Sequence, residues 1–146
     1  MSFEEIRIIC VVYTSVILPI LIYIRNKSRL PSWVPRMYLI SFLACALGWE
    51  LWFNYGWVDG VSVDLRRSEA LNTWLPKNIN WLMNSLGDTG AIIFGGFWLM
   101  WLYSKKDMRV FSEWSWGAFA VLIVWCIGQN ILVEMFLYHD QLSEGM

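Results

Sequence analysis

Four long runs of apolar residues, separated by polar connections, set the pattern of this chain. They cover residues 6–24, 37–57, 79–103 and 114–138. As a helix, each run is long enough to cross the hydrocarbon core of a bilayer, which takes about 20 apolar residues. We therefore predict an all-α fold, with residues 1–146 forming a single transmembrane domain. The fold class is a polytopic membrane protein, a bundle of four transmembrane helices.

Basic residues are distributed unevenly between the connections. The connections after the first and third runs hold seven Lys and Arg, whereas the N-terminus, the connection 58–78 and the C-terminal tail together hold four. Because Lys and Arg concentrate on the cytoplasmic side of membrane proteins, we predict that the N- and C-termini are non-cytoplasmic. Residues 58–78 then form an extracytoplasmic loop. The host membrane is a plasma or inner membrane, or the endoplasmic reticulum.

The connection 58–78 has two readings. Residues 64–75 can form a short helix at the membrane interface, and the alternative is an irregular surface loop. In the helical reading, four residues make its apolar side: Leu65, Leu71, Trp74 and Leu75.

Composition supports the membrane class and narrows the chemistry. Hydrophobic residues make up 58% of the chain, which includes 11 Trp, and Trp favours membrane interfaces and lipophilic pockets. The net charge of −1 argues against a nucleic-acid partner. Because the chain has one histidine and no CxxC motif, we expect no metal site and no cofactor, and we interpret Cys10, Cys45 and Cys126 as buried thiols.

Three pairs of an acid and an amide interrupt the apolar runs. In each pair the two residues lie four positions apart, which places them on one face of a helix. The pairs are Glu50 with Asn54, Asn84 with Asp88, and Asn130 with Glu134. With the predicted topology, the acids lie about 6–13 Å below the outer surface at 1.5 Å per residue. An ionisable residue within a membrane helix is a functional-site hypothesis.

These pairs predict one polar pocket in the outer half of the bundle. Carboxyl groups that share an apolar site cannot all ionise, so an acid and a base stand side by side. Nearby aromatic rings can stabilise a cation. The alternative is that the polar groups are hydrogen-bonding partners that hold the helices together. The candidate catalytic residues are Glu50, Asp88 and Glu134, and the candidate substrate-binding residues are Trp49, Trp52, Asn54, Asn84, Gln129 and Asn130.

The run Cys45-Ala46-Leu47-Gly48-Trp49-Glu50 resembles a motif of a known enzyme family. It is similar to the Asn-x-x-Trp-Glu motif of the membrane-integral terpene cyclases of fungal meroterpenoid and indole-diterpene pathways. The resemblance implies that Glu50 protonates an epoxide or alkene and that Asp88 takes the place of the family's aspartate. The chain departs from the family in two ways: Ala46 replaces the motif's Asn, and four helices are expected instead of seven.

Two classes of function fit this pattern. One is an acid-initiated isomerase or cyclase that acts on a lipophilic, isoprenoid-like substrate. The other is a non-enzymatic binder, either a proton-coupled transporter or an accessory subunit of a larger membrane complex. The cytoplasmic halves of the second to fourth runs are apolar, and the sequence shows no pair of inverted repeats with broken helices. Both features predict a pocket open to one side, which favours an enzyme or a binding subunit over a transporter. Expected partners are the lipid bilayer, a lipophilic small molecule, and either a second copy or a larger membrane complex. The glycines of the third run are the expected contact surface for a second copy.

Overall fold

The computed structural model describes residues 1–133 and 135, and it is mostly helical. Its long helical segments match the four predicted runs, although two of them are interrupted. Within the described residues these segments are α1 (Phe3–Asn26), α2 (Val34–Leu47) followed by α3 (Trp49–Tyr55), α6 (Lys77–Gly90) followed by the π-helix η1 (Ala91–Gly95) and α7 (Gly96–Tyr103), and α8 (Trp116–Leu132).

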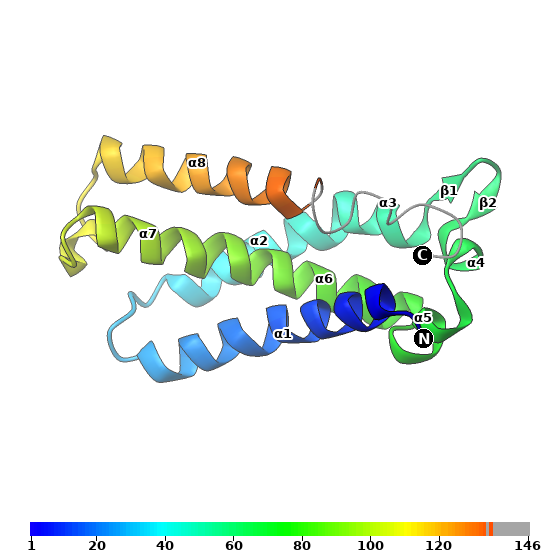
Figure 1. Cartoon of the computed structure of the whole chain (residues 1–146). Helices are drawn as coiled ribbons and strands as arrows, with labels where there is room; N and C mark the ends of the chain where they lie inside the picture. The colour runs from blue at the N-terminus through cyan, green and yellow to red at the C-terminus, as the bar shows by residue number, and fades with distance from the viewer. Residues whose placement is uncertain (134, 136–146) are drawn as a thin grey trace.

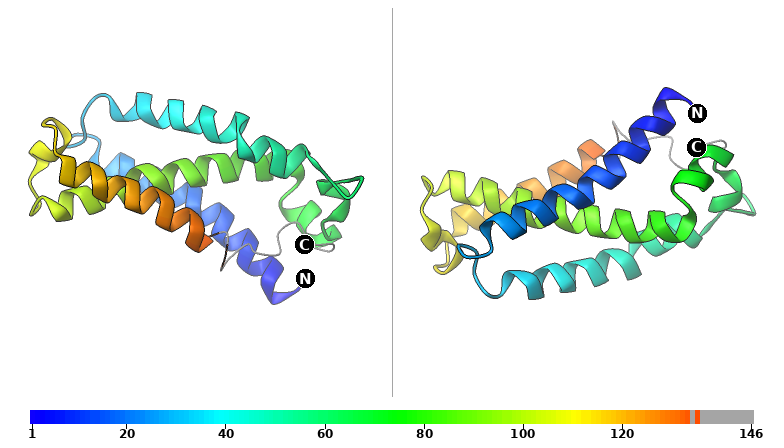
Figure 2. Two further views of the ribbon diagram at one scale, coloured as in Figure 1. Left: turned by 90° about the horizontal axis from the view of Figure 1, so that it is seen from above. Right: turned by 90° about the horizontal axis from the view of Figure 1, so that it is seen from below.

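The third segment lies at the centre of the arrangement. Helix α6 packs against α1, α2 and α3, while its continuation α7 packs against α8. The connections after α1 and α7 lie at one end of the molecule, and the N-terminus lies at the other end with the long connection 56–76 (Figures 1 and 2). The connections that carry most of the basic residues therefore share one end, which we call the basic end.

One helix of the described residues is long and apolar enough by itself to cross a membrane, namely α1. Helices α2 and α3 qualify as a pair, bent by 40° where they meet, and α8 is apolar but shorter. The second segment is therefore a broken helix, a feature that the sequence pattern did not predict. Helix α1 starts with a capping box, in which the Ser2 hydroxyl accepts from the Glu5 amide and the Glu5 carboxylate accepts from the Ser2 amide.

Glycines on the third segment bring the helices close together. A Cβ atom at Gly87 would collide with Ser15 of α1, and one at Gly90 would collide with Pro19. At Gly95 a Cβ atom would lie 2.5 Å from the ring of Trp125 on α8. These small residues thus pack against α1 and α8 of the same chain, and the expectation that they form the contact surface for a second copy is wrong.

The long connection is folded rather than irregular. Strands β1 (Trp57–Val58) and β2 (Val61–Ser62) pair antiparallel through a turn at Asp59 and Gly60, where both residues have positive φ, 53° and 80°. Such a turn matches the natural twist of a hairpin. Two short helices follow, α4 (Val63–Arg66) and α5 (Glu69–Trp74).

The predicted apolar side of the connection is divided in the structure. Leu71 and Leu75 are buried, whereas Leu65 and Trp74 are 76% and 60% exposed. One continuous interfacial helix is therefore ruled out. The Tyr13 hydroxyl of α1 donates to the Trp74 carbonyl at 2.9 Å, which ties the connection to the bundle.

Charged groups fix both ends of the bundle. In the long connection, the Lys77 ammonium lies 2.9 Å from the Asp64 carboxylate and lowers the pKa of that carboxyl. At the basic end, a 3₁₀-helix (Met108–Phe111) joins α7 to α8. Asp107 caps this turn by accepting from the Arg109 amide at 2.9 Å.

The close approach of α1 and α6 provides the first test. We expect Gly90→Ala to destabilise the fold by about 1–3 kcal/mol, because the added methyl group overpacks the contact with Pro19. Gly128→Ala on α8 is the matched control, since a Cβ atom there meets nothing within 4 Å. Thermal or denaturant unfolding of the purified protein measures both. Equal stability of the two variants would refute the assigned α1–α6 contact.

Candidate functional site

A break in the second helical segment positions the candidate site. Gly48 separates α2 from α3 with φ −89° and ψ −119°, and a Cβ atom there would lie 2.5 Å from the Ala44 carbonyl oxygen. The conformation therefore favours glycine. Trp49 and Glu50 follow directly, in the first turn of α3.

The break leaves a backbone carbonyl without its helical partner, and a tryptophan satisfies it. The Trp81 indole of α6 donates to the Ala46 carbonyl oxygen at 2.8 Å. A similar hydrogen bond forms at the π-helix, where the Trp125 indole of α8 donates to the Ala91 carbonyl oxygen at 2.9 Å. Irregular helices in an apolar environment are tolerated where a neighbour satisfies the freed backbone groups. Each irregular segment is thus fixed to its neighbouring helix.

Glu50 lies at one end of a chain of amides that crosses from α3 to α6. The Glu50 side chain is buried, at 6% exposure, and its Oε2 accepts from the Asn54 amide at 2.9 Å. The same Asn54 nitrogen donates to the Glu50 carbonyl oxygen at 2.8 Å, and the Asn54 oxygen accepts from Asn80 at 2.6 Å. The predicted pairing of Glu50 with Asn54 is therefore confirmed, and a second amide holds it in place.

Asn80 is a site residue that the sequence reasoning missed. It lies one turn before Asn84 and two turns before Asp88, so the three positions follow one face of α6. The spacing of four residues could have identified Asn80. It was missed because Asn80 lies at the start of the apolar run, where polar residues are common. Asn84 is half-buried between the two.

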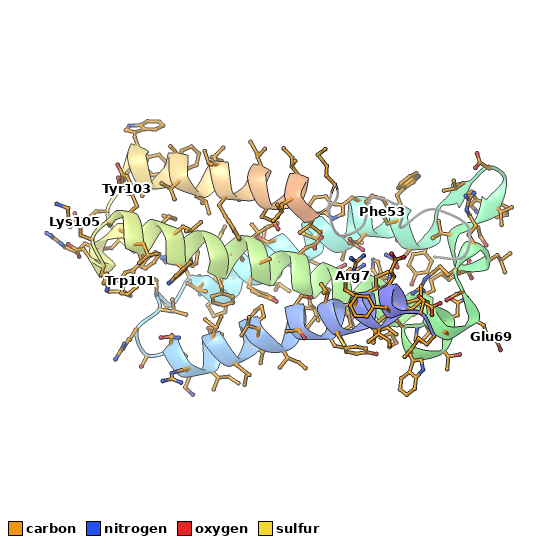
Figure 3. All side chains as sticks on the ribbon, in the orientation of Figure 1. Arg7, Phe53, Glu69, Trp101, Tyr103 and Lys105 are labelled. Carbon is orange, nitrogen blue, oxygen red and sulfur yellow. The ribbon has the colours of Figure 1, made fainter. Side chains whose placement is uncertain are left out.

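Asp88 is held by the residue that precedes Glu50. Its Oδ2 accepts from the Trp49 indole at 3.1 Å, which joins α6 to α3 a second time. Cys45 of α2 contacts the residue that follows Asp88, since its sulfur lies 3.7 Å from the Thr89 hydroxyl. The structure thus places Glu50 and Asp88 around one region between α2, α3 and α6. Figure 3 shows the side chains on the ribbon of the described residues.

The other candidate residues lie on different surfaces. Trp52 is 52% exposed and packs edge-on against Phe53, with ring centroids 5.1 Å apart, so most of its ring lies on the outer surface of α3. Gln129 is buried and lines a hollow between α7 and α8. Asn130 donates to the Cys126 carbonyl of its own helix at 2.7 Å. Glu134 lies outside the described residues.

The cysteines are free thiols, but they differ in burial. Cys45 is buried next to the acids, Cys126 is half-buried, and Cys10 is exposed on α1. The interpretation of all three as buried is therefore wrong for Cys10. Among residues 1–133 and 135, no three His, Cys, Asp or Glu side chains are grouped as metal ligands.

Comparison with known proteins finds no relative of this chain: no family model, no curated protein and no solved structure matches it. The chemistry of the site therefore rests on its own residues. These are a buried carboxyl group that accepts from one amide, a second amide that holds the first, and another carboxyl group that accepts from an indole.

The indole that satisfies the broken helix provides the second test. We expect Trp81→Phe to destabilise the fold by about 1–2 kcal/mol, because it leaves the Ala46 carbonyl unsatisfied while keeping an aromatic ring. Trp98→Phe is the control, since Trp98 is 58% exposed on α7. Unfolding in mixed micelles measures both variants. If Trp98→Phe costs as much as Trp81→Phe, the hydrogen bond is not what holds the break.

Proposed function

We propose that this chain is a four-helix membrane protein that carries out acid-initiated isomerisation or cyclisation of a lipophilic, isoprenoid-like substrate. The observation that carries the proposal is the buried Glu50 carboxyl group, fixed by Asn54 and Asn80. A structural hydrogen bond between helices needs no carboxyl group, since an amide serves as well. A carboxyl group held in an apolar surrounding is suited to give up or take a proton.

The apolar outer surfaces support membrane placement. Large hydrophobic side chains lie exposed on each long segment, among them Leu21 at 57%, Ile40 at 61% and Val124 at 71%. A water-soluble bundle would bury such residues or expose them singly. Helix α1 also packs along α6 and α5, so it is part of the bundle. The proposed orientation puts the basic end in the cytoplasm.

The residues take distinct roles in the proposed reaction. Glu50 donates a proton to an alkene or epoxide of the substrate, and a carbocation forms. The ring closes or rearranges, a neighbouring carbon loses a proton to a base, and the substrate mass is unchanged. Asp88 is the candidate base, and its bond to the Trp49 indole places an aromatic ring next to the cation's path. Asn54 and Asn80 act as positioning residues for Glu50.

A non-enzymatic binder is the second candidate, and the helix break favours it. Discontinuous membrane helices are typical of transporter binding sites, and here Gly48 breaks the segment directly before Trp49 and Glu50. In this reading Glu50 and Asp88 bind a proton together with a small lipophilic or cationic compound. The two candidates share the same residues and differ in whether the ligand is chemically changed.

Cysteine labelling tests the proposed orientation. The background lacks Cys10, Cys45 and Cys126, and the probes are Thr73→Cys in the long connection and Ser28→Cys at the basic end; both positions are exposed. We expect a membrane-impermeant maleimide to label position 73 in intact cells and position 28 after permeabilisation. The reverse pattern would invert the topology, and labelling of both positions in intact cells would rule out membrane placement.

Product analysis in heavy water tests the proposed reaction. The purified protein in nanodiscs is incubated in D₂O with linear polyprenyl substrates, with and without a terminal epoxide. We expect products that are isomers of the substrate with a different retention time, and one carbon-bound deuterium where an alkene is protonated. Glu50→Gln and Asp88→Asn should each lower the rate by about 10²–10⁴-fold, the usual contribution of a general acid or base. Liquid chromatography with mass spectrometry measures the products.

The control for this experiment is Glu69→Gln, which removes an exposed carboxyl group in α5. It should leave the rate unchanged. Full activity of folded Glu50→Gln and Asp88→Asn would exclude proton transfer at this site. Recovery of every substrate unchanged, with uptake of the compound into proteoliposomes that depends on Glu50, would select the transporter instead.

A further inference from the structure

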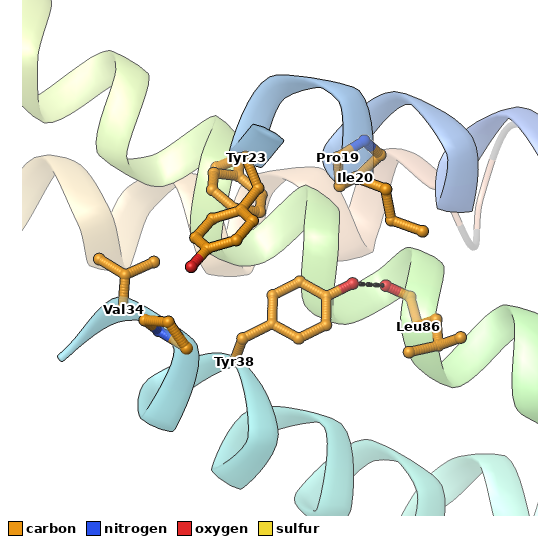
Figure 4. Close-up of a pocket in the computed structure, with 8 residues that line it drawn as sticks. Pro19, Ile20, Tyr23, Val34, Tyr38 and Leu86 are labelled. Atoms are coloured by element: carbon orange, nitrogen blue, oxygen red, sulfur yellow. Dashed lines mark hydrogen bonds between the residues drawn. The ribbon is translucent and has the colours of Figure 1, made fainter. Parts of the chain in front are cut away.

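A pocket lies between helices towards the basic end of the bundle. It opens between α1, the start of α2 and the third segment, with a volume of about 220 Å³ (Figure 4). The residues that shape it include Pro19, Ile20, Tyr23, Tyr38, Leu86 and Phe94. It is separate from the Glu50 region, which lies between α3 and α6.

The walls of this pocket suit a hydrocarbon. The Phe94 ring lies 6.4 Å from the Tyr23 ring and 6.0 Å from the Tyr38 ring, so three aromatic side chains gather around it. The Tyr38 hydroxyl donates to the Leu86 carbonyl at 2.8 Å, which satisfies the polar end of that ring. What remains towards the pocket is almost entirely apolar.

The size and opening of the pocket indicate part of a long molecule. Pockets that enclose a whole small ligand usually measure about 300–1,000 Å³, and this one is smaller. Ile20 is 48% exposed, so it stands at the edge between the pocket and the outer surface. A chain segment of a lipid can therefore enter from the side.

Basic residues follow directly on the pocket-lining residues in the sequence. Arg25 is two positions after Tyr23, and Arg36 is one position after Pro35. With Lys27 and Arg29, they make four exposed cations, and residues 25–36 contain no acid. We call these four residues the basic collar.

No ion pair links the collar to an acid in the described part of the chain. By contrast, Arg66, Lys77 and Arg109 each pair with an aspartate at 2.7–3.1 Å. Unpaired basic residues beside an apolar pocket between membrane helices are suited to an anionic lipid headgroup.

We propose that this pocket holds one hydrocarbon chain of an anionic phospholipid, whose phosphate group contacts the basic collar. The aromatic residues of the pocket contact the hydrocarbon chain of the lipid, and the basic collar favours an anionic headgroup over a neutral one. The site rests on membrane placement but not on acid chemistry, so Glu50→Gln should bind the lipid as the wild-type protein does.

Native mass spectrometry of the detergent-purified protein tests this site. The protein is mixed with equal amounts of phosphatidylglycerol and phosphatidylcholine that carry the same oleoyl chains. We expect the phosphatidylglycerol adduct to exceed the phosphatidylcholine adduct by at least about fivefold, the effect of one basic contact. The double change Arg25→Gln and Arg36→Gln should bring the ratio close to one. Ile20→Trp should reduce both adducts by filling the mouth of the pocket.

Two controls separate this site from general attraction to the basic end. Lys105→Gln with Lys106→Gln removes two exposed charges from the other connection at that end, and Ile17→Trp adds a ring one turn away on α1, at a residue that is 55% exposed and outside the pocket. Both should keep the wild-type ratio and amount. Equal adducts of the two lipids on the wild-type protein, or the same losses in the controls, would overturn the proposal.

A photoreactive phosphatidylglycerol with a diazirine in its acyl chain tests the wild-type protein without any substitution. We expect crosslinks on the peptides that contain Tyr23 and Phe94. Crosslinks spread evenly over the outer surfaces of all helices, or absent from these two peptides, would contradict a defined chain site.

Discussion

The need to satisfy backbone carbonyls where the helices are irregular governs how this bundle is built. In an apolar surrounding, a backbone carbonyl without a hydrogen bond destabilises the fold by roughly several kcal/mol. At Gly48 and in the π-helix η1, a tryptophan indole from a neighbouring helix donates to a backbone carbonyl: Trp81 to Ala46, and Trp125 to Ala91. These bonds join α2 to α6 and α8 to η1, so the irregularities become the points at which helices are held together.

The candidate site depends on the first of these points. Without the break, Trp49 and Glu50 would continue the helical path of α2. With it, α3 turns by 40° and meets α6, where Asn80 holds the Asn54–Glu50 pair and Asp88 accepts from Trp49. Trp81 is itself next to Asn80 in sequence, so one turn of α6 supplies both the support for the backbone and the anchor for the acid. Trp81, which supports the backbone, and Asn80, which holds the acid, are thus neighbours on α6. A change at one of them is expected to disturb the other.

The sequence predicted the course of the chain well, because the period and length of apolar runs depend on local composition. The segment 6–24 became Phe3–Asn26, and the segment 79–103 became a helical path from Lys77 to Tyr103. The pairing of Glu50 with Asn54 also followed from local spacing. What could not be predicted depends on contacts between helices: the break at Gly48, the role of Asn80, and the burial of Leu71 and Leu75. A hydropathy profile does not distinguish a glycine that breaks a helix from one that packs against a neighbour. It also does not show which neighbouring helix a given face contacts.

The central claim is that Glu50 is a titrating carboxyl group held by Asn54 and Asn80 rather than an inert bundle contact. Infrared difference spectroscopy through a pH titration observes that group directly. The account predicts a carboxylic acid C=O band that disappears in Glu50→Gln and shifts in frequency in Asn80→Ala, where the Asn54 amide is no longer fixed. A band that is unchanged in both variants, or no carboxyl band assignable to Glu50 at any pH, would contradict it.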